Sequence, residues 1–278
     1  MHSFPVPLVV LGPGSQPVDQ ELDTLDLPTE MATFRPPVKE DSACPAVYDA
    51  ALDQLRHLLA AMGAVAYGSA TPVRLSCSDW EPALVAEVNE MLGQGDVSVQ
   101  APGAGLHAQE TAFTGIWRVR GPGLDLIEAS AFPCPLRDCA LARPLPQLSA
   151  APAPDGLMNS PVLVAEIRAR AQAYQPGQAA QVINLTLLPV TPEDLAYLDQ
   201  CLGRGDFAIL SRGFGNCRIT ATAYPHVWWV QYFNNKDKLL LNSIEVVDIP
   251  AVALAAEEDY RDSRERLAEW LQCLESSR

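Results

Sequence analysis

The feature that most constrains this chain is a short text that it carries twice. Residues 92–105 read LGQGDVSVQAPGAG, and residues 202–215 read LGRGDFAILSRGFG. The identical pairs are Leu92/Leu202, Gly93/Gly203, Gly95/Gly205, Asp96/Asp206, Gly103/Gly213 and Gly105/Gly215. Because glycine allows turns and close approaches that other residues resist, the repeated spacing predicts the same local backbone at two places.

The similarity extends on both sides of this text. PVRLSCSDWEP (72–82) aligns with VINLTLLPVTP (182–192), and ETAFTGIW (110–117) aligns with TATAYPHVW (220–228). Further on, LIEASAFP (126–133) aligns with SIEVVDIP (243–250). The period is too long for a solenoid repeat, so it predicts a duplicated domain.

Each copy has the same predicted order of elements. A helix (46–62 and 161–174) is followed by a short strand, a second helix that ends at the glycines, and several strands joined by short turns. We therefore predict an α+β fold: two tandem copies of a module whose helices pack on one face of a mainly antiparallel sheet. The predicted segments are an extended N-terminal arm (1–44), a first repeat domain (45–133), a proline-rich linker (134–159), a second repeat domain (160–252) and a C-terminal helix (253–278).

Composition narrows the choice of partners and compartment. The chain has 19 basic and 34 acidic residues and a net charge of −15, which argues against nucleic acid and anionic membranes as partners. No apolar run is long enough to insert into a membrane, and the N-terminus lacks the basic region of a secretory signal. The seven cysteines are scattered, which is typical of reduced thiols. We expect a cytoplasmic protein without cofactor or metal.

The sequence contains no recognisable reaction centre. The glycines precede strands, whereas the dinucleotide pattern needs a helix after them. Neither a nucleophile elbow, nor a zinc-protease helix, nor a phosphate-binding loop is present. We therefore expect a protein that is not an enzyme.

Two segments are candidates for binding a partner. The first is in the arm, whose motif GPGSQP comprises Gly12, Pro13, Gly14, Ser15, Gln16 and Pro17, and whose later text LPTEMATFRPP contains Met31. The second is a group of aromatic residues in the predicted strand 226–233 and just before it: Tyr224, Trp228, Trp229 and Tyr232. Strand alternation places Trp228 and Tyr232 on one face and Trp229 on the other, so one face is core and the other is exposed or covered by a helix. Exposed aromatic side chains are frequent anchors of interfaces.

The same motifs resemble a known family. The GPGSQP arm, the LPTEMATFRPP segment and the text LGRGDF…YPHVWWVQYFN…IEVVDIP are similar to hydrogenase expression proteins of the HupH/HyaF type, nearly from end to end. The first copy departs from the second at TGIWRVRGPG, where Arg118 follows Trp117 in place of a second tryptophan.

The resemblance implies an accessory chaperone of [NiFe]-hydrogenase maturation. Its expected partners are the precursor of the iron–sulfur small subunit, before export, and a thioredoxin-like accessory protein. Two other functions remain open. One is an iron–sulfur carrier or redox protein that uses Cys134 and Cys139 with Cys44 or Cys217, and the other is a scaffold that joins other accessory proteins.

Overall fold

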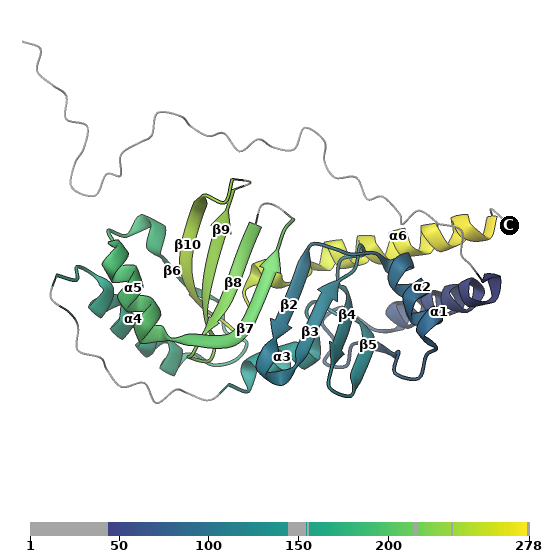
Figure 1. Cartoon of the computed structure of the whole chain (residues 1–278), viewed down its shortest axis with the longest axis horizontal. Coiled ribbons are helices and arrows are strands. Elements are labelled where there is room, and N and C mark those ends of the chain that lie inside the picture. The colour runs from purple at the N-terminus through teal and green to yellow at the C-terminus, as the bar shows by residue number, and fades with distance from the viewer. Residues whose placement is uncertain (1–43, 144–153, 155, 214–215, 235, 277–278) are drawn as a thin grey trace, which may run out of the picture. The chain divides into compact units, whose positions relative to one another are not determined.

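The strands of the two halves of the chain form one continuous sheet. The computed structural model describes residues 44–143, 154, 156–213, 216–234 and 236–276. Within these residues, ten strands lie in the order β1-β5-β4-β3-β2-β7-β8-β9-β10-β6 (Figure 1). Every neighbouring pair is antiparallel. The predicted α+β class and the antiparallel sheet are confirmed.

The first half of this sheet comes from residues before the proline-rich segment. Its elements are α1 (Pro45–Ala64), β1 (Val73–Ser76), α2 (Pro82–Leu92), β2 (Val97–Ala101), β3 (Leu106–Glu110), β4 (Ile116–Gly121), β5 (Leu124–Ala129) and α3 (Cys134–Leu141). The second half contains α4 (Ser160–Ala173), β6 (Gln181–Asn184), α5 (Pro192–Leu202), β7 (Arg204–Ser211), β8 (Asn216–Thr222), β9 (Val227–Phe233) and β10 (Leu239–Val246). A short 3-10 turn η2 (Leu185–Leu187) follows β6, and η3 (Ala251–Ala253) precedes the C-terminal helix α6 (Glu257–Ser276).

The two halves run through the same order of elements, helix–strand–helix and then four strands. Strands β2 and β7 pair at the centre, with Val99 opposite Ile209, and corresponding strands follow in the same order toward both edges. The two halves thus join edge to edge. Their origin by duplication stays a prediction.

The repeated glycines have matching positions in the two halves. Helices α2 and α5 end at Gly93 and Gly203, which have φ angles of 61° and 63°, in the region that favours glycine. Two residues later, Gly95 and Gly205 pass directly over the backbone carbonyl oxygens of Thr111 and Thr222, where any side chain would overlap those oxygens. The first two glycines therefore serve a helix end and a crowded strand entry.

The repeated aspartates connect one half to the other. The Asp206 carboxylate accepts a hydrogen bond from the backbone N–H of Gly103, which belongs to the first half. In the reverse direction, the Asp96 carbonyl accepts from the N–H of Arg212 at 3.1 Å, and Gly213 lies against the Asp96 carboxylate. The repeated text therefore builds both sides of the β2–β7 junction.

Apolar side chains of the described residues form three cores, one of which spans both halves. Helices α1 and α2 cover one face of the first half, and α4 and α5 cover part of the same face of the second half. The opposite face forms a continuous core that includes Trp117, Val119, Trp228 and Val230. Because Ile116 and Val227 belong to the helix-covered side, adjacent residues of β4 and β9 point to opposite faces, as the pleat requires.

Helix α3 corrects two predictions. The sequence predicts a proline-rich linker over residues 134–159 and helices on only one face of the sheet. Residues 134–141 instead form a helix whose Leu136 and Ala140 pack into the core of the opposite face. Its short apolar stripe, with a proline in the first turn, is too brief to be distinguished from loop text in the sequence.

Helix α6 returns from the end of the second half to the first. Tyr260, Leu267 and Leu271 are buried in the core that α1 and α2 form, and α6 lies beside α1 (Figure 1). The predicted C-terminal helix is therefore present, and its buried leucines dock it on the first half.

Candidate functional site

The middle of the sheet is open on the side that carries α2 and α5. Those helices cover the flanks, while the central strands β3, β2, β7 and β8 present exposed side chains there. His107, Gln100, Ala208 and Thr220 are all exposed. An open, mainly polar sheet face between two helices is a surface on which a polypeptide segment can lie.

A groove runs between α5 and this open face. Its volume is about 590 Å³. The apolar lining includes Leu195 on α5, Trp229 on β9 and Leu239 on β10, of which Leu239 is 41% exposed. The Trp229 indole N–H donates to Asn242 Oδ1 at 2.5 Å, and this hydrogen bond fixes the orientation of the ring. The groove thus offers a fixed, half-buried aromatic surface.

The rim of the α5 groove is charged. Asp199 on α5 receives two hydrogen bonds from the Arg204 guanidinium, at 3.2 and 3.0 Å. Asp206 is exposed beside them and accepts from Gly103 N–H. The lining carries two carboxylates and one guanidinium, which favours a partner segment with a positive charge.

A second groove occupies the corresponding place beside α2. Its volume is about 200 Å³, and its lining includes Asn89, His107, Gln109, Arg118 and Arg120. Strand register shows the correspondence, because Arg118 lies opposite Gln109 in the first half as Trp229 lies opposite Thr220 in the second. The two halves therefore present different chemistry at equivalent positions.

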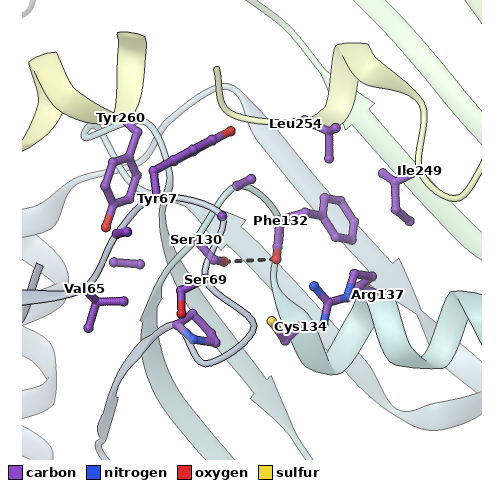
Figure 2. A pocket seen from close by; sticks show the side chains of 15 residues that line it. Val65, Tyr67, Ser69, Ser130, Phe132, Cys134, Arg137, Ile249, Leu254 and Tyr260 are labelled. Carbon is purple, nitrogen blue, oxygen red and sulfur yellow. Dashed lines mark hydrogen bonds between the residues drawn. The ribbon is translucent and has the colours of Figure 1, made fainter. Parts of the chain in front are cut away.

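A third cavity lies between α1, α3 and the turn that precedes α6. Figure 2 shows the side chains of Tyr67, Ser130, Cys134, Arg137 and Tyr260 around this space of about 140 Å³. The Tyr67 hydroxyl donates to the Ala255 carbonyl at 2.5 Å, and Ser130 donates to the Phe132 carbonyl at 3.0 Å. Burial, together with the nearby Glu128 carboxylate, raises the pKa of the Cys134 thiol. The thiol is therefore protonated at neutral pH and unreactive.

The aromatic residues that the sequence suggested for partner binding differ in how deeply they are buried. Tyr224 and Trp228 are buried, and the Trp228 indole N–H donates to the Val247 carbonyl at 2.9 Å. Both side chains lie in the cores. The alternation of β9 turns Trp228 inward, whereas Tyr224 lies in the turn before this strand and packs in the core beneath α4 and α5. Trp229 faces the α5 groove, as the alternation predicted.

Tyr232 lies on the other face, beside Cys217. Burial raises the pKa of Tyr232 to about 12 and that of Cys217 to about 11, so both side chains are neutral at physiological pH. The arm candidates Gly12, Pro13, Gly14, Ser15, Gln16, Pro17 and Met31 lie outside the described residues.

The cysteines are dispersed over the fold. Cys134 is buried at the start of α3, Cys217 is buried in β8 and Cys44 is exposed before α1. Among the residues that the structure describes, no three His, Cys, Asp or Glu side chains gather in a way that could hold a metal ion. Helices of the described part are all too short or too polar to cross a bilayer.

The α2 groove was not predicted from the sequence. There, Arg118 stands out only because it takes the place of a second aromatic residue. Its neighbours His107 and Arg120 lie opposite one another on β3 and β4, a relation that appears only when the strands are paired in register.

Several known proteins that are similar to this chain have names that refer to hydrogenases. The model described as "HupH hydrogenase expression protein, C-terminal conserved region" matches residues 157–274. The hydrogenase expression/formation protein HoxQ of Cupriavidus necator is 41% identical over 98% of both chains. HupH of Rhodobacter capsulatus is 44% identical over 99% of both, and the hydrogenase-1 operon protein HyaF of Escherichia coli is 36% identical over 95% of both.

A solved structure is also similar in part. The hydrogenase expression protein HupH from Thiobacillus denitrificans is 28% identical, with a TM-score of 0.39, and the match covers 41% of this chain and 95% of that chain.

Proposed function

Because this chain belongs to the family of hydrogenase expression/formation proteins that includes HupH, HoxQ and HyaF, we propose that it is an accessory chaperone of [NiFe]-hydrogenase maturation. Its client is the precursor of the iron–sulfur small subunit, which it binds in the cytoplasm before export. The observation that carries the proposal is the 41% identity to HoxQ over 98% of both chains.

The α5 groove is the surface that suits such a client best. Trp229, Leu195 and Leu239 offer apolar contact area, and the Trp229 ring is already held by its hydrogen bond to Asn242. Binding through a side chain that is ordered beforehand loses less conformational entropy than binding through a mobile one. An extended client segment can therefore place an apolar side chain on Trp229 while its backbone crosses the open sheet.

Charge supports the same client. The protein carries a net charge of −15, and the groove rim includes Asp199 and Asp206. Opposite charges steer association and fix the direction of a bound segment. A basic segment of the proposed client is therefore a suitable ligand for this rim.

The thioredoxin-like accessory protein is proposed as a second partner. It would bind the same complex rather than the same groove. The arm residues 12–17 and Met31 stay a predicted contact for either partner, and removal of residues 1–44 tests them separately.

The experiment is co-purification of the small-subunit precursor with the tagged full-length protein. Leu239→Asp places a charge in the groove at a residue that is 41% exposed, so it leaves the fold intact. We expect it to reduce recovery of the precursor at least fivefold, and Trp229→Ala to do the same. Retention of normal recovery by both variants would remove the α5 groove from the proposal.

Val162→Asp is the matched control. Val162 is 70% exposed on α4 and does not line the groove, so the same change of charge occurs elsewhere on the second half. Recovery with this variant should equal that of the unchanged protein. Absence of the precursor from every preparation, the unchanged protein included, would contradict the proposed client itself.

A further inference from the structure

The α2 groove is cationic on a protein that is strongly acidic. Its lining contains the guanidinium groups of Arg118 and Arg120 and the imidazole of His107, and no carboxylate is among the described residues that line it. The rest of the chain brings the net charge to −15. A cleft that is lined by positive charge attracts anions and raises their local concentration.

The Nε and Nη1 atoms of the Arg118 guanidinium have partners that hold the side chain in place. Its Nε donates to Asn89 Oδ1 at 2.8 Å, and its Nη1 donates to the Leu126 carbonyl at 3.0 Å and pairs with Asp125. The side chain is only 10% exposed. A guanidinium fixed in this way cannot swing away to solvent, so its geometry toward the groove is set in advance.

The remaining nitrogen of Arg118 has no acceptor. Within the described part of the chain, Nη2 is buried and makes no hydrogen bond. Buried donors are almost always paired, and an exception calls for an explanation such as a missing ligand. An acceptor that entered the groove would complete the set of bonds at this guanidinium.

The charges near the groove do not balance. Asp125 is the carboxylate that pairs with Arg118, and the same oxygen lies 3.8 Å from Arg120 Nε. One carboxylate therefore neutralises only one of the two guanidinium charges, so about one positive charge remains uncompensated. Arg120 is exposed, and His107 lies directly opposite it on β3, so both can reach a ligand at the mouth of the groove.

The corresponding groove of the second half lacks this chemistry. Trp229, Gln231 and Arg218 lie at the places of Arg118, Arg120 and His107 by strand register. There, Arg218 pairs with Asp237 and stacks over Phe233. The positive charge of the α2 groove is thus a property of this half and not of the shared fold.

We propose that the α2 groove is a binding site for a carboxylate, held between Arg118 and Arg120 with His107 as a further donor. A carboxylate matches the planar guanidinium fork and carries the single negative charge that the groove leaves uncompensated. A dianionic phosphate would exceed that charge. The site lies outside the α5 groove, so it stands or falls independently of the proposed client surface.

The carboxylate can come from a polypeptide or from a free small molecule, and three probes separate these sources. The full-length, ¹⁵N-labelled protein is titrated at constant ionic strength with acetyl-glutamate N-methylamide, with acetate and with inorganic phosphate. Arginine Nε–Hε and backbone amide signals are followed. We expect saturable shifts at Arg118, Arg120 and Gln94 with the capped glutamate. Equal affinity for acetate would assign the site to free carboxylates.

Arg120→Gln is the principal variant, because Arg120 is exposed and its replacement spares the buried Arg118 network. We expect it to weaken carboxylate binding at least fivefold. Arg218→Gln removes the charge of another exposed arginine, on β8 and outside the groove, and should leave binding unchanged. Tighter binding of phosphate than of either carboxylate, an absence of saturable shifts, or equal affinity of the Arg120→Gln variant would overturn the proposal.

Discussion

At the scale of single residues, the most unusual environment belongs to Glu110, at the end of β3. The residue is 5% exposed, and its carboxyl accepts one hydrogen bond, at 3.0 Å, from the N–H of Gly115. Burial, with a smaller contribution from the charges of Asp96 and Asp259, raises its pKa to about 7. The second half has Ala221 at the corresponding position, so this acid is particular to the first half.

Glu110→Gln therefore makes stability less dependent on pH. Between the usual pKa of 4.5 and about 7, the folded state holds the Glu110 proton more tightly than the unfolded chain, so the free energy of unfolding falls as pH rises. The glutamine keeps the acceptor for Gly115 and cannot ionise. We expect the variant to gain up to about 3 kcal/mol relative to the unchanged protein between pH 4.5 and 8.

Chemical denaturation at pH 5, 6, 7 and 8 measures this difference. The difference in free energy of unfolding between the two proteins should increase from pH 5 to pH 7 and stay constant above pH 7.5. A gap that is the same at every pH would contradict the raised pKa.

At the scale of elements, Asp194 joins the starts of two helices. Its Oδ1 accepts from the N–H groups of Met158, Asn159 and Ser160 and from the Ser160 hydroxyl, and its Oδ2 accepts from the N–H of Thr191. Burial opposes ionisation, but these hydrogen bonds outweigh it and hold the pKa at about 2. Thr191 and Asp194 also form a capping box at the start of α5. Ser160 donates to Asp194 and does not cap its own helix.

Asp194→Asn should separate α4 from α5. The new amide nitrogen faces the Thr191 N–H or the start of α4, so at least one donor loses its acceptor. We expect a loss of about 2–4 kcal/mol at pH 7. Because the native pKa lies below the unfolded value of 3.8, the contribution of Asp194 is present above that value and declines as pH falls toward 2.

Urea unfolding at pH 7 and pH 3 tests this prediction. The difference in free energy of unfolding between the unchanged protein and the Asp194→Asn variant should be smaller at pH 3. Asp199→Asn is the control on the same helix, because Asp199 forms a surface pair with Arg204 and should cost less than about 1 kcal/mol. Equal losses for the two variants would show that Asp194 has no special role.

The sequence predicted the elements better than their contacts. Glycine pairs, the TPED start of α5 and the alternation of β9 are local signals, so their structures could be predicted. Helix α3, the burial of Trp228 and the cluster of His107, Arg118 and Arg120 depend on which strands pair and which face a helix covers. These are properties of the assembled sheet, and no local pattern encodes them.

At the scale of the whole molecule, the central β2–β7 pair determines how the halves depend on one another. In the second half alone, β7 would be an edge strand, with Phe207 and Ile209 deprived of part of their core. Exposed edges of this kind pair with another strand. The junction is antiparallel, so a second β7 can take the place of β2 with two-fold symmetry.

We therefore expect a fragment of residues 157–256 to form a dimer through β7. Light scattering after size exclusion should give twice the mass of the fragment at tens of micromolar, with dissociation on dilution. The full-length protein, whose β7 is covered by β2, is the reference for the same column. A fragment that stays monomeric at every concentration would contradict this prediction.

Helix α6 also has a consequence for biosynthesis. Tyr260, Leu267 and Leu271 complete the apolar interior beneath α1, although α6 is synthesised after every strand of the described sheet. The first half therefore cannot reach its final packing before α6 has been synthesised. A premature stop codon before α6 would leave α1 without its cover.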